Sequence, residues 1–276
     1  MESKKSLLPV KSDFVFKLIF GDQRNVDILG AFLSSVLDIP KDEYERITII
    51  NPHLKKESKD DKYGILDVKL HTKNGSIVHI EIQLKVLTNL KPRIVYSLSK
   101  LITEQISSGE DWGIIKRTIS IVITDEVFIV TGDKYHHQFR YRTKDGIDFT
   151  DLVEINTLDL SKLPKNDDST DLWYWMKFIK SDNEEEIDML AEKSPQMKKA
   201  VGILKELSAD ERNRMLYESR FMAEIDLNSR VSDEKKKWQK VVAEKDATIA
   251  EKEIALAEKD AEIAKYEAEI AKLKLS

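Results

Sequence analysis

The chain has 276 residues, of which 41% are hydrophobic and 34% are charged, so it can bury a core and also carries many exposed charged groups. It contains no cysteine, which excludes disulfides, thiolate zinc sites and cysteine nucleophiles, and its formal net charge of −5 is not the basic balance typical of nucleic-acid-binding domains. No apolar run reaches the roughly 18 residues of a membrane span and the N-terminus lacks the apolar core of a signal peptide, so we expect a cytoplasmic protein with no membrane partner.

The first predicted elements are helical. Helical spacing of apolar residues predicts a helix over 10–38, interrupted near Gly21. Either Ser12 or Asp13 can cap its start, because both side chains can accept a hydrogen bond from the first free backbone N–H groups. A short strand rich in β-branched residues is predicted next, over 47–51.

A β-hairpin over residues 66–85 is the most strongly predicted element of the chain. Two runs of alternating apolar and polar residues flank Asn74-Gly75, a typical hairpin turn. A two-residue loop would place the apolar side chains of the two runs on opposite faces of the sheet, whereas a three-residue loop with Gly75 in the left-handed conformation places them on the same face. We therefore predict the three-residue loop, because it turns one set of aliphatic side chains toward the core: Val68, Leu70, Ile80 and Ile82.

The same register brings acidic residues together on the other face of the hairpin. Asp67 is predicted to lie opposite Glu81, with Gln83 pointing the same way one step along the strand. Two carboxylates at the roughly 5 Å spacing of opposed side chains repel each other unless a proton or a cation lies between them. Because paired oxygen ligands suit hard cations, the pair predicts a site for Mg²⁺ or Mn²⁺.

The elements after the hairpin extend the predicted sheet. A helix is predicted over 89–107, ended by Gly109. Thr118–Thr124 is a continuous apolar run, as expected of a strand that is covered on both faces. Two more strands are predicted near 137–143 and 151–158.

The composition changes at residues 164–168. This boundary separates an α/β domain over 1–165, a mixed sheet flanked by helices, from an all-α extension over 166–232. The aromatic helix near 172–179 has acidic neighbours, which argue against base stacking, so we predict that it packs on the α/β core. Further helices are predicted near 184–193, 195–207 and 209–230.

Residues 233–276 are predicted to form a long charged helix with a seven-residue repeat. Ile249, Leu256, Ile263 and Ile270 recur at this spacing, and alanine occupies most of the other apolar positions. A seven-residue period favours a left-handed coiled coil, through which the chain could form a homo-oligomer. The alternative is a solvated single helix, because alanine buries little area and charge pairs along the helix stabilise it in isolation.

Several stretches, in their order along the chain, are similar to one known family. Asp67, followed across the hairpin by Glu81-Ile82-Gln83, resembles the D…(D/E)xK nuclease motif with glutamine in the place of lysine. The chain thus resembles the recombination-promoting nuclease (Rpn) and putative transposase family of the PD-(D/E)xK superfamily. The resemblance covers residues 10–160, and its other stretches are Ser12–Gly21, Arg93–Tyr96 and Gly109–Trp112, the last leading into Ile119–Asp125.

The resemblance implies a restriction-endonuclease-like fold and a metal-dependent DNA endonuclease linked to recombination or mobile elements. It implies that Asp67, Glu81 and the backbone carbonyl of Ile82 bind Mg²⁺ or Mn²⁺. It also gives Asp13 a second interpretation beside helix capping, as a further acidic group near the metal. The metal would lower the pKa of water and offset the charge of the transition state.

Because glutamine stands in the place of the motif lysine, the site lacks the positively charged side chain that the motif usually supplies. Gln83 can orient the attacking water by hydrogen bonding but carries no charge, so we expect Lys69, on the same face, to supply the missing charge. The candidates for contacts with DNA phosphates are Lys17, Arg93 and Lys100.

A second hypothesis is a catalytically weak or inactive DNA- or protein-binding module that keeps the nuclease fold. It would gain support if Asp67, Glu81 and Gln83 diverge, or if a basic residue fills the metal position. The sequence has no glycine-rich phosphate loop and no serine-nucleophile motif, which argues against nucleotide-driven and serine-hydrolase activities.

Overall fold

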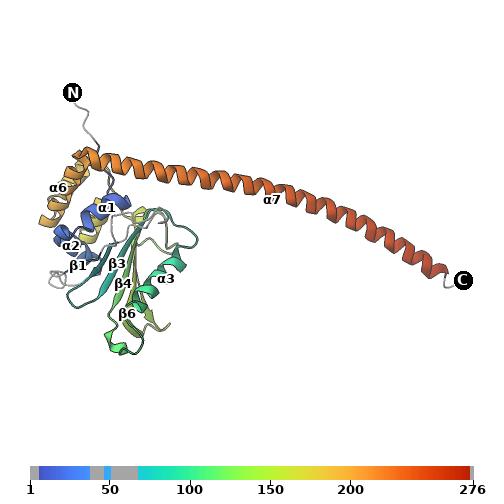
Figure 1. Cartoon of the computed structure of the whole chain (residues 1–276), viewed down its shortest axis with the longest axis horizontal. Coiled ribbons are helices and arrows are strands. Elements are labelled where there is room, and N and C mark those ends of the chain that lie inside the picture. The colour runs from blue at the N-terminus through green and yellow to red at the C-terminus, as the bar shows by residue number, and fades with distance from the viewer. Residues whose placement is uncertain (1–5, 38–46, 51–67, 274–276) are drawn as a thin grey trace, which may run out of the picture. The chain divides into compact units, whose positions relative to one another are not determined.

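The computed structural model describes residues 6–37, 47–50 and 68–273 (Figure 1). Within these residues the chain forms a six-stranded mixed sheet of order β1-β2-β3-β4-β6-β5. The central pairs, β3 with β4 and β4 with β6, are parallel, and the outer pairs are antiparallel. The strands are β1 (Thr48–Ile49), β2 (Val68–His71), β3 (Ile77–Gln83), β4 (Thr118–Thr124), β5 (His136–Arg142) and β6 (Asp148–Asp159).

The hairpin formed by β2 and β3 has the predicted register. Val68 lies opposite Ile80 and Leu70 opposite Val78, so the aliphatic side chains of both strands face the same side of the sheet. Thr72 N donates to Ser76 O across the loop at 3.0 Å, and Gly75 has a φ of +83°, the left-handed conformation expected of it. The three-residue loop is therefore confirmed.

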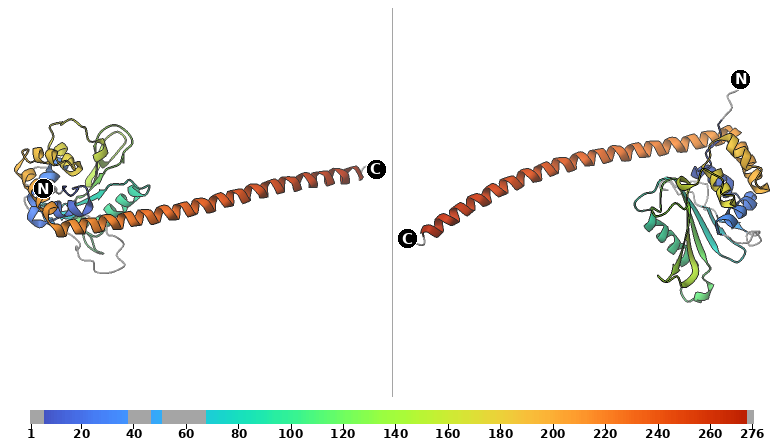
Figure 2. Two further views of the ribbon diagram at one scale, coloured as in Figure 1. Left: turned by 90° about the horizontal axis from the view of Figure 1, so that it is seen from above. Right: turned by 180° about the vertical axis from the view of Figure 1, so that it is seen from behind.

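Helices cover one face of the sheet and enclose the main hydrophobic core (Figures 1 and 2). The first of them begins at Asp13 because the Ser12 hydroxyl accepts a hydrogen bond from Val15 N, 3.2 Å away. A 3₁₀ turn over Gln23–Asn25 then separates the first two helices, where the sequence predicted an interruption. The helices on this face are α1 (Asp13–Phe20), α2 (Val26–Leu37), α4 (Asp171–Lys180), α5 (Glu184–Leu190) and α6 (Pro195–Ala209).

The aromatic helix α4 packs on the α/β core, as predicted. The Trp175 ring lies 5.8 Å from the Phe20 ring and 6.3 Å from the Phe32 ring, centroid to centroid. Phe178 is fully buried and also contacts Phe20. Because these rings belong to one core cluster, the helices after residue 165 and the sheet before it stabilise each other.

The other face of the sheet is covered by α3 (Leu90–Thr103), which packs through a smaller apolar cluster that includes Ile94 and Val122. The predicted end of this helix, near residue 107, was wrong. Beyond Thr103 the side chain of Gln105 bonds to the start of β4, donating to Thr118 Oγ1 at 2.8 Å and accepting from Lys116 N at 2.7 Å. These bonds turn the chain toward the strand before Gly109 is reached.

The last helix, α7 (Glu211–Leu273), is a single unbroken helix of 63 residues (Figure 2). It crosses residue 232, where the sequence predicted a boundary between the helical extension and the tail. The chain divides into two compact units, Met1–Tyr217 and Glu218–Ser276, and the domain bounds expected from the sequence stay a prediction. No helix among the described residues is long and apolar enough to cross a membrane.

Candidate functional site

The polar face of β3 lies beneath α3 and carries His79, Glu81 and Gln83. Glu81 is only 2% exposed, because β3 is flanked by strands on both sides and covered by the helix. Val122 of β4 lies beside Glu81 in the parallel register. A buried carboxylate costs free energy unless it is paired, so its partner decides what this face can do.

That partner is Arg93, on the first half of α3. Its Nη2 group donates to Glu81 Oε1 in a short hydrogen bond and to Gln83 Oε1 at 2.6 Å. Its Nε group is buried and has no hydrogen-bond partner among the described residues. Glu81 and Gln83 therefore converge, and a guanidinium lies where their oxygens meet.

Lys69, the predicted source of charge beside Glu81, bonds elsewhere. It lies opposite His79 in the register, and its Nζ is 3.3 Å from the Glu104 carboxylate at the end of α3. Lys100 lies on the same helix, 3.8 Å from Glu104, with its side chain 62% exposed. Burial, and then the charge of Lys69, lowers the pKa of the neighbouring His71.

The two candidate residues of α1 differ in exposure. Asp13 is exposed at the start of the helix, and its carboxylate accepts a hydrogen bond from Phe14 N at 2.6 Å. Lys17 is only 4% exposed, which disfavours the predicted direct contact with a DNA phosphate. Ile82 lies in β3 with its side chain in the main core, and the role of its carbonyl stays a prediction.

Asp67, the other predicted carboxylate of the motif, lies outside the described residues, so its pairing with Glu81 stays a prediction. Among the residues that are described, no group of three or more histidine, aspartate and glutamate side chains forms a cluster that could hold a metal ion. Glu81 and Gln83 nonetheless present two converging oxygens, and the guanidinium between them shows that the pair attracts a cation. This donor set fits a hard divalent cation.

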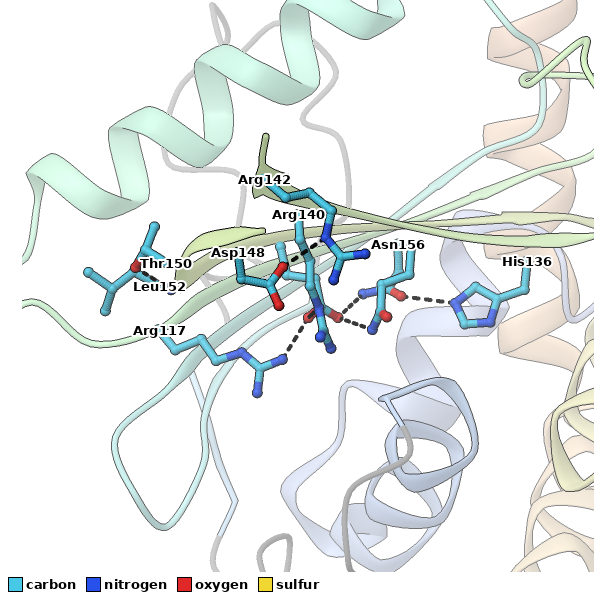
Figure 3. A network of polar contacts seen from close by, with 10 residues as sticks. Arg117, His136, Arg140, Arg142, Asp148, Thr150, Leu152 and Asn156 are labelled. Carbon is cyan, nitrogen blue, oxygen red and sulfur yellow. Dashed lines mark hydrogen bonds and ion pairs between the residues drawn. The ribbon is translucent and has the colours of Figure 1, made fainter. Parts of the chain in front are cut away.

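A second polar cluster, which the sequence did not predict, is centred on Glu154 of β6. Figure 3 shows Arg117, Arg140 and Asn156 of this cluster. The Glu154 side chain is 1% exposed and accepts from Arg117 Nη2 at 2.6 Å and Arg140 Nε at 3.0 Å. Gln138 and Asn156 donate to its other oxygen at 2.8 and 2.7 Å. Burial raises the pKa of Glu154, but the hydrogen bonds from Asn156, Arg117 and Gln138 and the charge of Arg117 outweigh it, so the pKa is lowered overall.

The sequence held only a weak signal for this cluster. Arg140 alternates with aromatic residues along β5, which indicates a strand with one polar face. The pairing of β5 with β6, and of β6 with β4, decides that this face meets Glu154 and Arg117. No local pattern specifies that order.

Comparison with known proteins places the chain in a family. A family model described as PD-(D/E)XK nuclease family transposase matches residues 10–234. The chain belongs to this family. The predicted family is therefore confirmed, and the mixed sheet flanked by helices is its restriction-endonuclease-like fold. No curated protein and no solved structure matches the chain.

The PD-(D/E)XK match also extends further than the sequence resemblance did. It includes α4, α5 and α6 and the beginning of α7. This agrees with the shared core, in which aromatic residues of α4 pack on α1 and α2. The helices after residue 165 are thus part of what the family has in common.

Proposed function

We propose that this PD-(D/E)XK protein is a metal-dependent DNA endonuclease that hydrolyses phosphodiester bonds. The observation that carries the proposal is the convergence of Glu81 and Gln83 on one cationic group, on a strand held in the middle of the sheet. These are the last acidic residue and the final position of the family motif. Membership of a nuclease family supports the same reaction class. A role in recombination or mobile-element activity, and a cytoplasmic location, are part of the proposal.

The residues that would hold the metal are Asp67, Glu81 and the carbonyl of Ile82, with Asp13 as a further acidic group. Mg²⁺ or Mn²⁺ is the expected ion because all of these ligands are oxygens. When bound, the metal would make the attacking water more acidic and offset charge on the phosphate.

The chain's own residues would then orient and stabilise the reacting groups. Gln83 can hold the attacking water through its amide, which both donates and accepts hydrogen bonds. We assign the missing positive charge to Arg93 in place of Lys69, because Arg93 already contacts Gln83 whereas Lys69 is bonded to Glu104. Lys100 is exposed on the outer side of α3 and is proposed to contact the DNA backbone. Lys17 could make such a contact only if its buried side chain became accessible.

One observation favours the second hypothesis, a binding module without catalytic activity. Arg93 is a basic residue that fills the position next to Glu81 where a metal would bind. If that ion pair is permanent, the guanidinium takes the place of the metal and the site cannot perform hydrolysis. The two functions therefore differ in whether Arg93 leaves Glu81.

Nicking of supercoiled plasmid by the full chain, in Mg²⁺, Mn²⁺ or EDTA, tests the proposal. We expect metal-dependent nicking that falls by about 100-fold or more in Asp67→Ala and Glu81→Ala, because each removes a carboxylate that would hold the metal. Asp188→Ala is the matched control, since this exposed aspartate of α5 lies outside the site and pairs with Lys205.

Three outcomes of the nicking experiment have different meanings. Loss of nicking in both variants but not in the control supports the endonuclease. Equal nicking by all proteins shows that the activity is a contaminant. If none of them nicks DNA and all still bind it, the binding module is the better description.

A further inference from the structure

An apolar stripe runs along α7. It recurs at every seventh residue and consists of large aliphatic side chains, each of them more than half exposed. Their exposed fractions are 52%, 53%, 61%, 54% and 51% for Val242, Ile249, Leu256, Ile263 and Ile270. A helix in water gains nothing from exposing such a stripe, which is the pattern of a helix that packs against another along its length.

Charged residues of opposite sign flank this stripe on its two sides. One flank is acidic and consists of the residues three positions before the last four stripe residues: Asp246, Glu253, Asp260 and Glu267. The other flank is basic and consists of residues four positions before: Lys245, Lys252 and Lys259. On a helix, positions three and four residues away lie on opposite sides of the starting residue. The stripe is thus bordered by negative charge on one side and positive charge on the other.

The two flanks cannot neutralise each other within one helix. Each lysine of the basic flank is followed directly by an acid of the other flank, and neighbouring residues point about 100° apart on a helix. The ion pairs between described side chains of α7 include Lys236–Asp233 and Lys237–Glu234, and neither of these belongs to a flank. Charge pairs three or four residues apart would stabilise a solvated single helix. Within the two flanks only Lys259 has an acid at that spacing, Glu262, whereas Lys245 and Lys252 have none.

We propose that the stripe is covered by the same stripe of a second copy of this chain, and that the two helices run parallel. In a parallel pair related by a twofold axis along the helices, the acidic flank of each helix faces the basic flank of the other. In an antiparallel pair, acidic flanks would face each other and so would basic flanks, which is repulsive. The seven-residue period makes the pair a left-handed coiled coil.

Exposed residues nearer the start of α7 extend the same seam. Val231 and Trp238 are 60% and 65% exposed, and they occupy the helix positions at which the basic lysines recur further along. The apolar surface thus continues toward the start of α7 on Val231 and Trp238, while the stripe positions there are Lys235 and Asn228. Trp238 would add a large buried surface to each helix of the pair.

A parallel pair has a consequence for the rest of the protein. Each Met1–Tyr217 unit is continuous with the first end of its own helix, so both units belong to the same end of the coiled coil. If the proposed endonuclease activity holds, the dimer carries two sites that could act on the two strands of one duplex. The dimer itself does not depend on that activity.

The mass of the full chain in solution, measured by sedimentation over a range of concentrations, tests the interface. We expect a dimer for the natural chain and a dissociation constant raised roughly 100-fold or more by Leu256→Asn, which puts two amides into the seam. Ile254→Asn is the matched control, because Ile254 is 64% exposed but lies on the far side of the helix. A natural chain that is monomeric throughout, or a dimer unchanged by Leu256→Asn, would overturn the proposal.

Disulfide crosslinking tests the direction of the helices, and the absence of natural cysteines makes it specific. Asn228→Cys and Ile263→Cys each place one thiol on the seam, about 50 Å apart along the helix. In a parallel dimer each variant crosslinks to itself, because like positions lie within the roughly 7 Å that a disulfide spans between Cα atoms. If neither crosslinks alone and a mixture of the two does, the dimer is antiparallel and the proposed direction is wrong.

Discussion

Arg93 determines the charge at the candidate site. Its guanidinium bonds to Glu81 and Gln83 together, so one residue of α3 neutralises the buried carboxylate of the sheet. The proposed metal would need the same carboxylate, so the arginine and the metal would compete for Glu81. Once displaced, the guanidinium would remain close to the site and could supply the positive charge that Gln83 lacks.

Substitution of Arg93 separates these two effects. We expect Arg93→Ala to bind Mn²⁺ more tightly than the natural chain, because Glu81 loses its competing cation, yet to nick DNA about 100-fold more slowly, because the charge is missing at the transition state. Arg93→Lys should have an Mn²⁺ affinity and a nicking rate between those of the natural chain and of Arg93→Ala. Mn²⁺ binding followed by electron paramagnetic resonance and plasmid nicking give the two values.

Lys100→Ala is the control for the Mn²⁺ measurement alone, because Lys100 is exposed on the same helix but is itself a proposed DNA contact. It should leave Mn²⁺ binding unchanged. If Arg93→Ala nicks DNA at the natural rate, then Arg93 supplies no charge to the reaction and Lys69 becomes the candidate again.

Among the elements, the β2–β3 hairpin fixes which residues face the site. Its three-residue loop depends on Gly75, whose φ of +83° is a conformation that other L-residues adopt at a cost. A shift of one residue would turn Glu81 and Gln83 toward the apolar core. The loop therefore supports the site as well as the stability of the sheet.

Gly75→Ala should lower the free energy of unfolding by about 1–2 kcal/mol, the cost of a left-handed conformation for a residue with a Cβ atom. The space around Gly75 does not add to this cost, since a Cβ there would lie 3.5 Å from the nearest atom, in the Lys116 side chain. Gly202→Ala, on an open surface of α6, should instead raise the free energy of unfolding by about 0.5–1 kcal/mol. Urea unfolding measures both, and equal effects of the same sign would contradict the argument.

Across the whole molecule, one core joins residues from Leu8 to Leu204, so the first unit is expected to unfold cooperatively. The Glu154 cluster contributes to this unit because one buried carboxylate joins β5, β6 and Arg117, the residue just before β4. Because folding lowers the pKa of Glu154, the ionised carboxylate stabilises the folded state. This stabilisation is fully present at pH values above the pKa that the group has in the unfolded chain. The contribution is lost as the pH falls through the lower pKa of the folded state.

Glu154→Gln should therefore destabilise the protein at pH 7 by roughly 3 kcal/mol, the low end for breaking a buried ion pair, because both arginines partly reach water. The difference from the natural chain should shrink in acid, where the natural Glu154 also becomes neutral. Thermal unfolding at several pH values measures this difference.

Arg142→Ala is the control; it breaks the exposed pair with Asp148 and should lower the free energy of unfolding by less than about 1 kcal/mol. A difference that stays constant with pH would show that the charge of Glu154 does not contribute.

The sequence by itself determined the local geometry of this protein. Alternation of apolar residues and the loop ending at Gly75 specify the register of the hairpin, because any other register exposes the aliphatic side chains. The sequence predicted that α1 starts at a cap formed by Ser12 or Asp13, of which the structure shows Ser12, and the ordered motif stretches were enough to identify the family. These are properties of neighbouring residues, which interact whatever the rest of the chain does.

Only the tertiary structure decided which side chains meet across elements. The pairing of Arg93 with Glu81, of Lys69 with Glu104, and of Arg117 and Arg140 with Glu154 joins residues on different elements. A periodic pattern tells which face a side chain occupies, but it does not tell which helix or strand will cover that face. Long lysine and arginine side chains reach several acceptors from one position, so their partners are fixed only when the elements have packed.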